Sequence, residues 1–262
     1  MRSTPKLLSD SIFRLRSAGC VFAEDEARLL LDAAGDSGEL ASLVDRRVAG
    51  EPLEVILGWA DFAGVRVVVE SGVFVPRQRT AFLVEQAVAV CPAGGVVVDL
   101  CCGSGAIGLA IATRARNVQV FAADIDPVAV RCTTINLVVV GGRAYCGDLF
   151  TPLPDRLRGS IDVVAVNAPY VPTDEIAFMP TEARDHEPQH TLDGGADGVE
   201  IHRRVAAEVS PWLRPGGHVL IETSEAQAEL TAAVLAAAGL TTRHLHDDER
   251  AATVVIGSRH PV

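Results

Sequence analysis

The sequence predicts an α/β fold: a mostly parallel sheet with helices on both faces, one antiparallel strand, and a small helical domain before it. Two patterns carry this prediction. From Thr80 onward, short apolar runs alternate with segments of helical spacing, and repeated strand–helix units are typical of a parallel sheet. Before that point, residues 7–50 show helical spacing alone, interrupted at Gly19, Gly35 and Gly50.

The N-terminal helical pattern ends near Pro52. Because so short a segment buries little apolar surface by itself, we expect it to pack against the rest of the chain. Residues 61–75 then show β-branched alternation around Gly64, which predicts a hairpin connector. The predicted division is a helical domain over residues 1–58, a β-hairpin connector over 59–76 and an α/β domain over 77–262.

Each later element has its own signal. The strands are short apolar runs, expected at 96–100, 118–123, 143–146, 161–166 and 217–222. The helices show apolar residues at helical spacing, and they are expected at 80–90, 106–113, 127–138, 198–212 and 225–238. Pro127 occupies a favoured first-turn position. Two last apolar segments, 241–245 and 252–256, flank a polar turn and predict a terminal hairpin that adds the antiparallel strand at the end of the sheet.

The composition is that of a soluble globular protein. Of the 262 residues, 48% are hydrophobic and 22% are charged, and no run reaches the roughly 18 uninterrupted apolar residues of a membrane span. The first 19 residues lack the compact apolar stretch of a secretory signal, so we expect a cytoplasmic protein with no membrane partner. An acidic chain of this size is expected to be a monomer.

The charge and the cysteines exclude further classes. The net charge of −11, from 23 basic and 34 acidic residues, disfavours non-specific binding to a polyanion, so nucleic acid is not an expected partner. The six cysteines form no Cys-x-x-Cys pair and no histidine lies at metal-ligand spacing. We therefore expect reduced structural cysteines and no metal.

A glycine-rich turn, Asp-Leu-Cys-Cys-Gly-Ser-Gly-Ala-Ile-Gly, occupies residues 99–108, between a strand and a helix. Such a turn lets the backbone approach a ligand closely, and the helix N-terminus offers unpaired N–H groups. Taken alone, it also matches the dinucleotide fingerprint, which leaves an NAD-linked oxidoreductase open. Asp99 favours another ligand, because its charge would oppose a pyrophosphate but could face the ammonium of an amino-acid group. S-adenosylmethionine has that ammonium.

Two further acidic residues follow strands. Asp124 ends the second strand, where a carboxylate can accept hydrogen bonds from two vicinal ribose hydroxyls. Asp148 follows the third strand and could accept from an adenine amino group, with Ile125 and Leu149 packing against the ring. An ordinary turn or N-cap aspartate is the alternative for Asp148. Glu222 also ends a strand; it could border the pocket, but a strand-end carboxylate is more often at the surface.

The tetrapeptide Asn167-Ala168-Pro169-Tyr170 follows the apolar run 161–166. The Asn167 side-chain oxygen and the Ala168 backbone carbonyl, fixed by the proline, make a pair of acceptors. Two acceptors suit an NH2 group whose third valence must face an electrophile. The tetrapeptide therefore indicates methylation of a planar amide or of an exocyclic amine.

With these motifs, the chain resembles the class I S-adenosylmethionine-dependent methyltransferases. More narrowly, it is similar to the protein-glutamine N5-methyltransferases of the HemK/PrmC type, which modify the glutamine of a Gly-Gly-Gln motif in peptide release factors. The resemblance runs from about Pro52 to the C-terminus. It rests on residues 51–58, Phe62, Gly64, 75–77, 99–108, Asp124, 147–150, 167–170, 186–188 and 193–198.

The resemblance implies a Rossmann-like sheet, a protein substrate and a helical domain that recognises it. It places Asp124 on the cofactor ribose, Asp148 on adenine and the backbone of 103–105 along the methionine portion. The residues expected at the cofactor are Arg79, Thr80, Asp99, Cys101, Gly103, Ser104, Gly105, Ile107, Asp124, Ile125, Asp148, Leu149 and Asn167. Those expected at the reacting centre are Asn167, Ala168, Pro169 and Tyr170, with the target amide held by Asn167 and the Ala168 carbonyl.

Two positions depart from the family pattern. The family's tetrapeptide is usually Asn-Pro-Pro-Tyr, whereas Ala168 stands at its second position here. The family's Pro-Arg-Pro-Glu-Thr becomes residues 76–80 with Arg79 in place of the acidic residue. Besides glutamine methylation, the motifs leave open N6-adenine methylation of nucleic acid and a non-catalytic, translation-associated protein that binds the cofactor.

Overall fold

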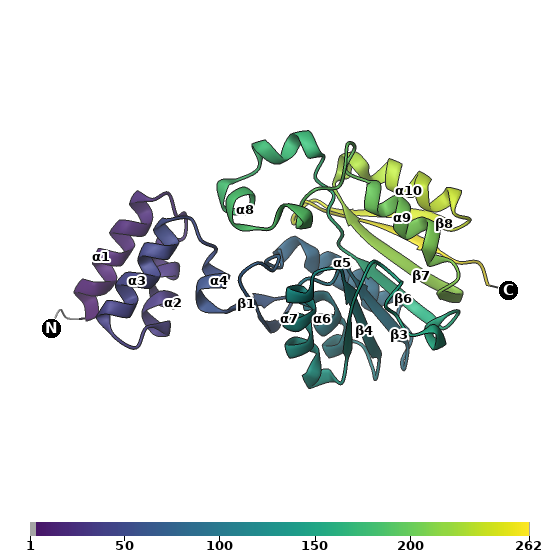
Figure 1. Ribbon diagram of the computed structural model, residues 1–262, viewed down its shortest axis with the longest axis horizontal. Helices are drawn as coiled ribbons and strands as arrows, with labels where there is room; N and C mark the ends of the chain where they lie inside the picture. Colours follow the sequence, from purple (N-terminus) through teal and green to yellow (C-terminus); the bar gives the residue numbers. More distant parts are fainter. Residues whose placement is uncertain (1–3, 262) are drawn as a thin grey trace.

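The computed structural model describes residues 4–261 and shows a helical bundle set apart from a larger α/β body (Figure 1). The bundle consists of α1 (Thr4–Ser17), α2 (Ala23–Ala33) and α3 (Ser37–Val48), and the short helix α4 (Leu53–Leu57) leads from it to the body. Its core contains Leu15, Leu30, Leu40 and Val44, all buried. Asp36 caps α3 by accepting hydrogen bonds from the backbone N–H groups of Gly38 and Glu39.

A β-hairpin follows the bundle. Its strands, β1 (Trp59–Phe62) and β2 (Val65–Val68), pair antiparallel across the two-residue turn Ala63-Gly64. Both turn residues have positive φ, 47° and 81°, as a tight hairpin requires. The hairpin therefore lies earlier than the expected segment 61–75, because the turn centres on Ala63-Gly64 and residues 69–75 form no strand. The division into three domains stays a prediction.

Seven strands of the described chain form the main sheet, in the order β5-β4-β3-β6-β7-β9-β8. All run parallel except β9, which is antiparallel to both neighbours. The prediction of a mostly parallel sheet with one antiparallel strand is confirmed, but that strand lies between β7 and β8 instead of at the edge. The strands are β3 (Val96–Leu100), β4 (Gln119–Asp124), β5 (Arg143–Cys146), β6 (Ile161–Val166), β7 (Leu213–Thr223), β8 (Thr241–Asp247) and β9 (Ala252–Ser258).

Helices cover both faces of this sheet (Figure 1). On one face lie α5 (Ala81–Val90), α6 (Ala106–Arg114) and α7 (Pro127–Leu137); on the other lie α9 (Glu200–Val209) and α10 (Ala228–Ala237). Strand β6 is buried on both sides: Val163 and Ala165 belong to the core with α5 and α6, and Val164 and Val166 to the core with α9 and α10. This two-sided burial explains why the strand is apolar from Val163 to Val166, after Asp162, which pairs with Arg214.

Helix α9 ends three residues before the expected boundary at 212. It ends at Val209, with Ser210 still in helical geometry, because Pro211 has no N–H to continue the helical hydrogen bonds. Among residues 4–261, no helix combines the length and the hydrophobicity needed to cross a membrane.

We expect Ile221→Val to lower the free energy of unfolding by about 0.5–1.5 kcal/mol, since it removes one methylene from a fully packed core. Ile221 lies in β7 and is 0% exposed. The same substitution at Ile135, which is 47% exposed on α7, is the matched control and should change little. Denaturant unfolding of both variants measures the difference, and equal effects would contradict the assigned core.

Candidate functional site

A cavity of about 630 Å³ lies where β3, β4 and β6 end, and it is the candidate active site. In the sheet order, β4 and β6 flank β3 on opposite sides, so the order in which the strands are added reverses at β3. Ligands of open α/β sheets bind at such a switch point, outside the carboxyl ends of the strands. The predicted residues in its wall are Arg79, Thr80, Cys101, Gly103, Ser104, Ile107, Asp124, Ile125, Asp148, Leu149, Asn167, Ala168, Pro169 and Tyr170.

The glycine-rich turn forms one wall. Gly103 and Gly105 have φ values of +54° and +76°, and a Cβ at Gly105 would lie 2.8 Å from Thr133 Cγ2. Only glycine fits that close approach without strain. Gly105 itself is not part of the cavity wall, so its contribution is to shape the turn that brings Gly103 and Ser104 there.

Asp99, the other predicted residue outside the cavity wall, is fully buried in β3. Its Oδ2 accepts a hydrogen bond of 2.8 Å from the Gly108 N–H and so holds the start of α6. Its Oδ1 has no partner among the described residues, and burial raises the pKa of Asp99 to about 8. A role opposite a cofactor ammonium stays a prediction.

Asp124 stands at the end of β4 with both carboxylate oxygens engaged. Oδ2 accepts from the Gly103 N–H at 2.9 Å, and Oδ1 accepts from the Asp126 N–H at 2.9 Å. Burial raises the pKa of Asp124. The neighbouring Ile125 lines the cavity and is 63% exposed, so it offers an apolar surface on which a ring could pack.

Asp148 has a partner that the sequence did not reveal. Its Oδ2 accepts a hydrogen bond of 2.5 Å from Arg204 Nη2, and Arg204 reaches the cavity from α9. No sequence motif marks Arg204, because α9 follows Asp148 only after a long intervening segment. The pair brings a cation to the end of the cavity where adenine is expected.

The tetrapeptide occupies the opposite side of the cavity, after β6. Asn167 Nδ2 donates a hydrogen bond of 3.3 Å to Thr80 Oγ1. The Asn167 side-chain oxygen takes no part in this hydrogen bond. Arg79 Nη2 donates to Tyr170 Oη at 2.7 Å. Ala168 is buried in the core against the sheet, so its side chain does not reach solvent.

Glu222 corrects a prediction. As a strand-end carboxylate it was expected at the surface, but it is only 1% exposed, and its Oε1 lies 3.6 Å from Arg79 Nε. The carboxyl end of β7 adjoins that of β6 in the sheet, which carries Glu222 next to the tetrapeptide. The sequence feature that could have placed Glu222 at the site is its position at the end of a strand, which it shares with Asp124.

A long loop, residues 171–192, borders the cavity and contains α8 (Thr181–His186). Met179, His190, Thr191 and Leu192 from this loop line the cavity. The contribution of these four side chains was not predicted from the sequence. His190 Nε2 also lies 3.5 Å from Asp126 Oδ2, at the start of α7.

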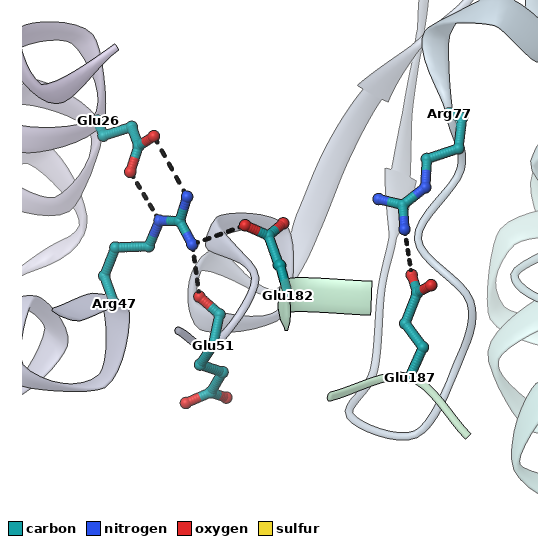
Figure 2. Close-up of polar contacts among 6 residues, drawn as sticks. All are labelled: Glu26, Arg47, Glu51, Arg77, Glu182 and Glu187. Carbon is teal, nitrogen blue, oxygen red and sulfur yellow. Dashed lines mark hydrogen bonds and ion pairs between the residues drawn. The ribbon is translucent and has the colours of Figure 1, made fainter. Parts of the chain in front are cut away.

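Two ion pairs hold this loop (Figure 2). Glu187, just after α8, accepts 2.8 Å and 3.3 Å hydrogen bonds from Arg77 Nη2 and the Val75 N–H. Glu182, within α8, pairs at 2.9 Å with Arg47 of the helical bundle, which also pairs at 2.7 Å with Glu26. The loop is therefore fastened both to the segment before α5 and to the bundle.

Among residues 4–261, no cluster of three or more His, Cys, Asp or Glu side chains is arranged to hold a metal ion. The site instead offers a shaped turn, a carboxylate and an apolar wall on one side, and hydrogen-bonding groups of the tetrapeptide on the other. This arrangement can hold a nucleoside-containing cofactor beside a small polar group.

Comparison with known proteins bears on this site. The family model described as "Methyltransferase small domain" matches residues 64–183. A release factor glutamine methyltransferase of Geobacter sulfurreducens is 33% identical, over 83% of this chain and 76% of that protein. A release factor glutamine methyltransferase of Streptomyces coelicolor is 39% identical, over 71% of this chain and 67% of that protein.

Solved structures show the same fold. A methyltransferase from Pyrococcus furiosus superposes with a TM-score of 0.55 at 15% sequence identity, covering 74% of this chain and 89% of that chain. At that identity the likeness concerns the fold alone.

Proposed function

Because the chain belongs to the release factor glutamine methyltransferase family, we propose that it transfers a methyl group from S-adenosylmethionine to the side-chain amide nitrogen, N5, of a protein glutamine. The acceptor we propose is the Gly-Gly-Gln glutamine of a peptide release factor. One observation carries the proposal: a single cavity joins the glycine-rich turn and Asp124 to the tetrapeptide of Asn167.

The residues present fit this cofactor. The Gly103 backbone and the Asp124 carboxylate would hold the methionine portion and the ribose, and Ile125 and Leu149 would flank the adenine near Asp148. Gly105 packs against Thr133 without room for a Cβ, and this shapes the turn that brings Gly103 and Ser104 to the cavity wall. When bound, S-adenosylmethionine supplies an electrophilic methyl group.

The tetrapeptide would hold the acceptor. An amide nitrogen is a poor nucleophile because its lone pair is delocalised into the carbonyl. The Asn167 side-chain oxygen and the Ala168 carbonyl would accept hydrogen bonds from the two N–H groups of this nitrogen. They would thereby favour a pyramidal nitrogen and align it with the methyl group. No strong general base is needed, because the N–H proton becomes acidic only as the N–C bond forms.

The alternatives find less support. Adenine methylation of nucleic acid fits poorly with a net charge of −11. A non-catalytic binding protein and an NAD-linked oxidoreductase are not favoured by the relatives named above. We propose in addition that the protein is a cytoplasmic monomer and that the helical bundle recognises the protein substrate.

The test is transfer of labelled methyl from S-adenosylmethionine into purified release factor, intact and with the Gly-Gly-Gln glutamine replaced, with single-stranded and duplex nucleic acid in parallel. We expect label in the intact factor alone. Label in nucleic acid would support adenine methylation instead. Absence of label from every acceptor, despite measurable cofactor binding, would refute the proposed activity.

A further inference from the structure

We propose that Glu222 is a positioning residue that orients both ends of the reacting tetrapeptide, Asn167 and Tyr170, through two directed hydrogen-bond relays. The inference rests on the proposed function and deepens it. It identifies what makes Asn167 present its oxygen, and not its NH2 group, to the acceptor amide.

Glu222 has the environment that such a role requires. It is 1% exposed, and in the described chain neither of its oxygens has a partner at hydrogen-bond geometry. The Thr80 hydroxyl, the Arg79 guanidinium and the Tyr170 hydroxyl nevertheless lie close enough to favour its charged form, against the burial that raises its pKa. Because a buried carboxylate without donors is costly, these hydroxyl groups are expected to turn their protons toward it.

The first relay runs through Thr80 to Asn167. A carboxylate only accepts hydrogen bonds, whereas a hydroxyl donates one proton and accepts through its lone pairs. With its single proton directed to Glu222, Thr80 Oγ1 is left as an acceptor, and Asn167 Nδ2 donates to it at 3.3 Å. The Asn167 side-chain oxygen is then the atom left for the acceptor amide.

The second relay runs from Arg79 through Tyr170. A guanidinium only donates, and Arg79 Nη2 donates to Tyr170 Oη at 2.7 Å. The proton of Tyr170 must therefore go to another acceptor, and the Glu222 carboxylate is the neighbouring one. Burial, followed by the charge of Glu222, raises the pKa of Tyr170 to about 12, so the phenol keeps that proton.

The direction of the hydrogen bonds in the first relay determines whether Asn167 can hold the acceptor amide. If the Asn167 amide were reversed, its NH2 group would face the NH2 group of the acceptor, donor against donor. Glu222→Gln keeps the size of the side chain but can donate as well as accept, so Thr80 is no longer compelled to donate to it. Thr80→Val keeps the shape and removes the relay, whereas Thr80→Ser retains the hydroxyl.

One test needs no reaction. The side-chain amide signals of Asn167 are observed by 1H–15N NMR of the acceptor-free protein and assigned by their absence in Asn167→Ala. They should shift in Glu222→Gln and in Thr80→Val, and stay in place in Thr80→Ser and in Glu229→Gln, whose carboxylate is 87% exposed on α10. If the chemical shifts of the Asn167 amide are the same in Glu222→Gln as in the wild type, the proposal is overturned.

The second test is kinetic. With a glutamine-containing peptide, Glu222→Gln and Thr80→Val should each lower kcat about tenfold while the Kd for the cofactor changes less than about twofold. Because both break one relay, the double variant should lose no more than the worse single variant, and Thr80→Ser should keep most of the activity. If the losses in kcat of the two single variants add in the double variant, or if they parallel a loss of cofactor affinity, the role of Glu222 is generally structural and the proposal is overturned.

These two tests separate the inference from the proposed function. If the wild-type protein methylates no glutamine, the proposed function fails, and the amide signals of Asn167 still decide whether Glu222 orients it. If the wild type is active and Glu222→Gln matches it in kcat, the inference fails and the function stands.

Discussion

Asn167→Ala is expected to reduce methyl transfer by about 10²–10³-fold, the effect of removing one preorganised polar group from a reacting centre. The substitution removes the side-chain oxygen that would accept an N–H of the target amide. It leaves intact the Gly103 turn and the Asp124 carboxylate, which lie at the other side of the cavity. Single-turnover transfer of labelled methyl measures the loss, and titration calorimetry measures cofactor affinity.

The affinity for S-adenosylmethionine should change by less than about twofold. Asn117→Ala, the same substitution in an exposed turn outside the cavity wall, provides the matched control and should transfer at the wild-type rate. A parallel loss of cofactor binding in Asn167→Ala would mean that the tetrapeptide supports the fold of the site and has no specific part in the reaction.

Asp124→Ala is expected to weaken cofactor binding by about 1–3 kcal/mol, which corresponds to roughly 5-fold to 150-fold in Kd. The carboxylate would hold the ribose hydroxyls, and its Oδ2 also fixes the Gly103 N–H of the turn. Both contributions disappear together, so a value near the upper end of the range is expected. Titration calorimetry with S-adenosylmethionine measures it directly.

Asp155→Ala removes one negative charge from a side chain that is 89% exposed and lies outside the cavity wall. It controls for the change in net charge and should bind the cofactor like the wild type. Equal affinities of Asp124→Ala and wild type would refute the ribose assignment. A lower unfolding temperature with unchanged affinity would assign Asp124 to the turn alone.

Much of the fold was predictable because its signals are local. The run Ile161–Val166 is apolar at every position except Asp162 because β6 is buried on both sides, and such runs flanked by helical spacing are typical of parallel sheets. The glycine-rich turn was predictable for the same reason, since positive φ at Gly103 and Gly105 restricts the residue type at each position. Boundaries were less certain where a proline or a tight turn decides them, as at Pro211.

The rest of the site could not be predicted because it depends on contacts between distant segments. Arg204 meets Asp148 only because α9 packs on the sheet. Glu222 joins the tetrapeptide only because β7 pairs with β6. The loop residues at the cavity wall follow from ion pairs such as Glu182 with Arg47, across 135 positions of sequence. Hydrophobic periodicity carries no information about any of these contacts.

The position of β9 bears on the order in which the sheet can assemble. It is the last strand of the described chain, yet it lies between β7 and β8, and β8 pairs with no other strand of the main sheet. During synthesis from the N-terminus, β8 therefore has no partner until β9 has been made, and the outer edge of β7 stays unpaired for the same interval. An unpaired strand edge is a site for aberrant pairing between chains. The final strand thus closes two edges in one step, and a nascent chain stalled just before it would be prone to aggregate.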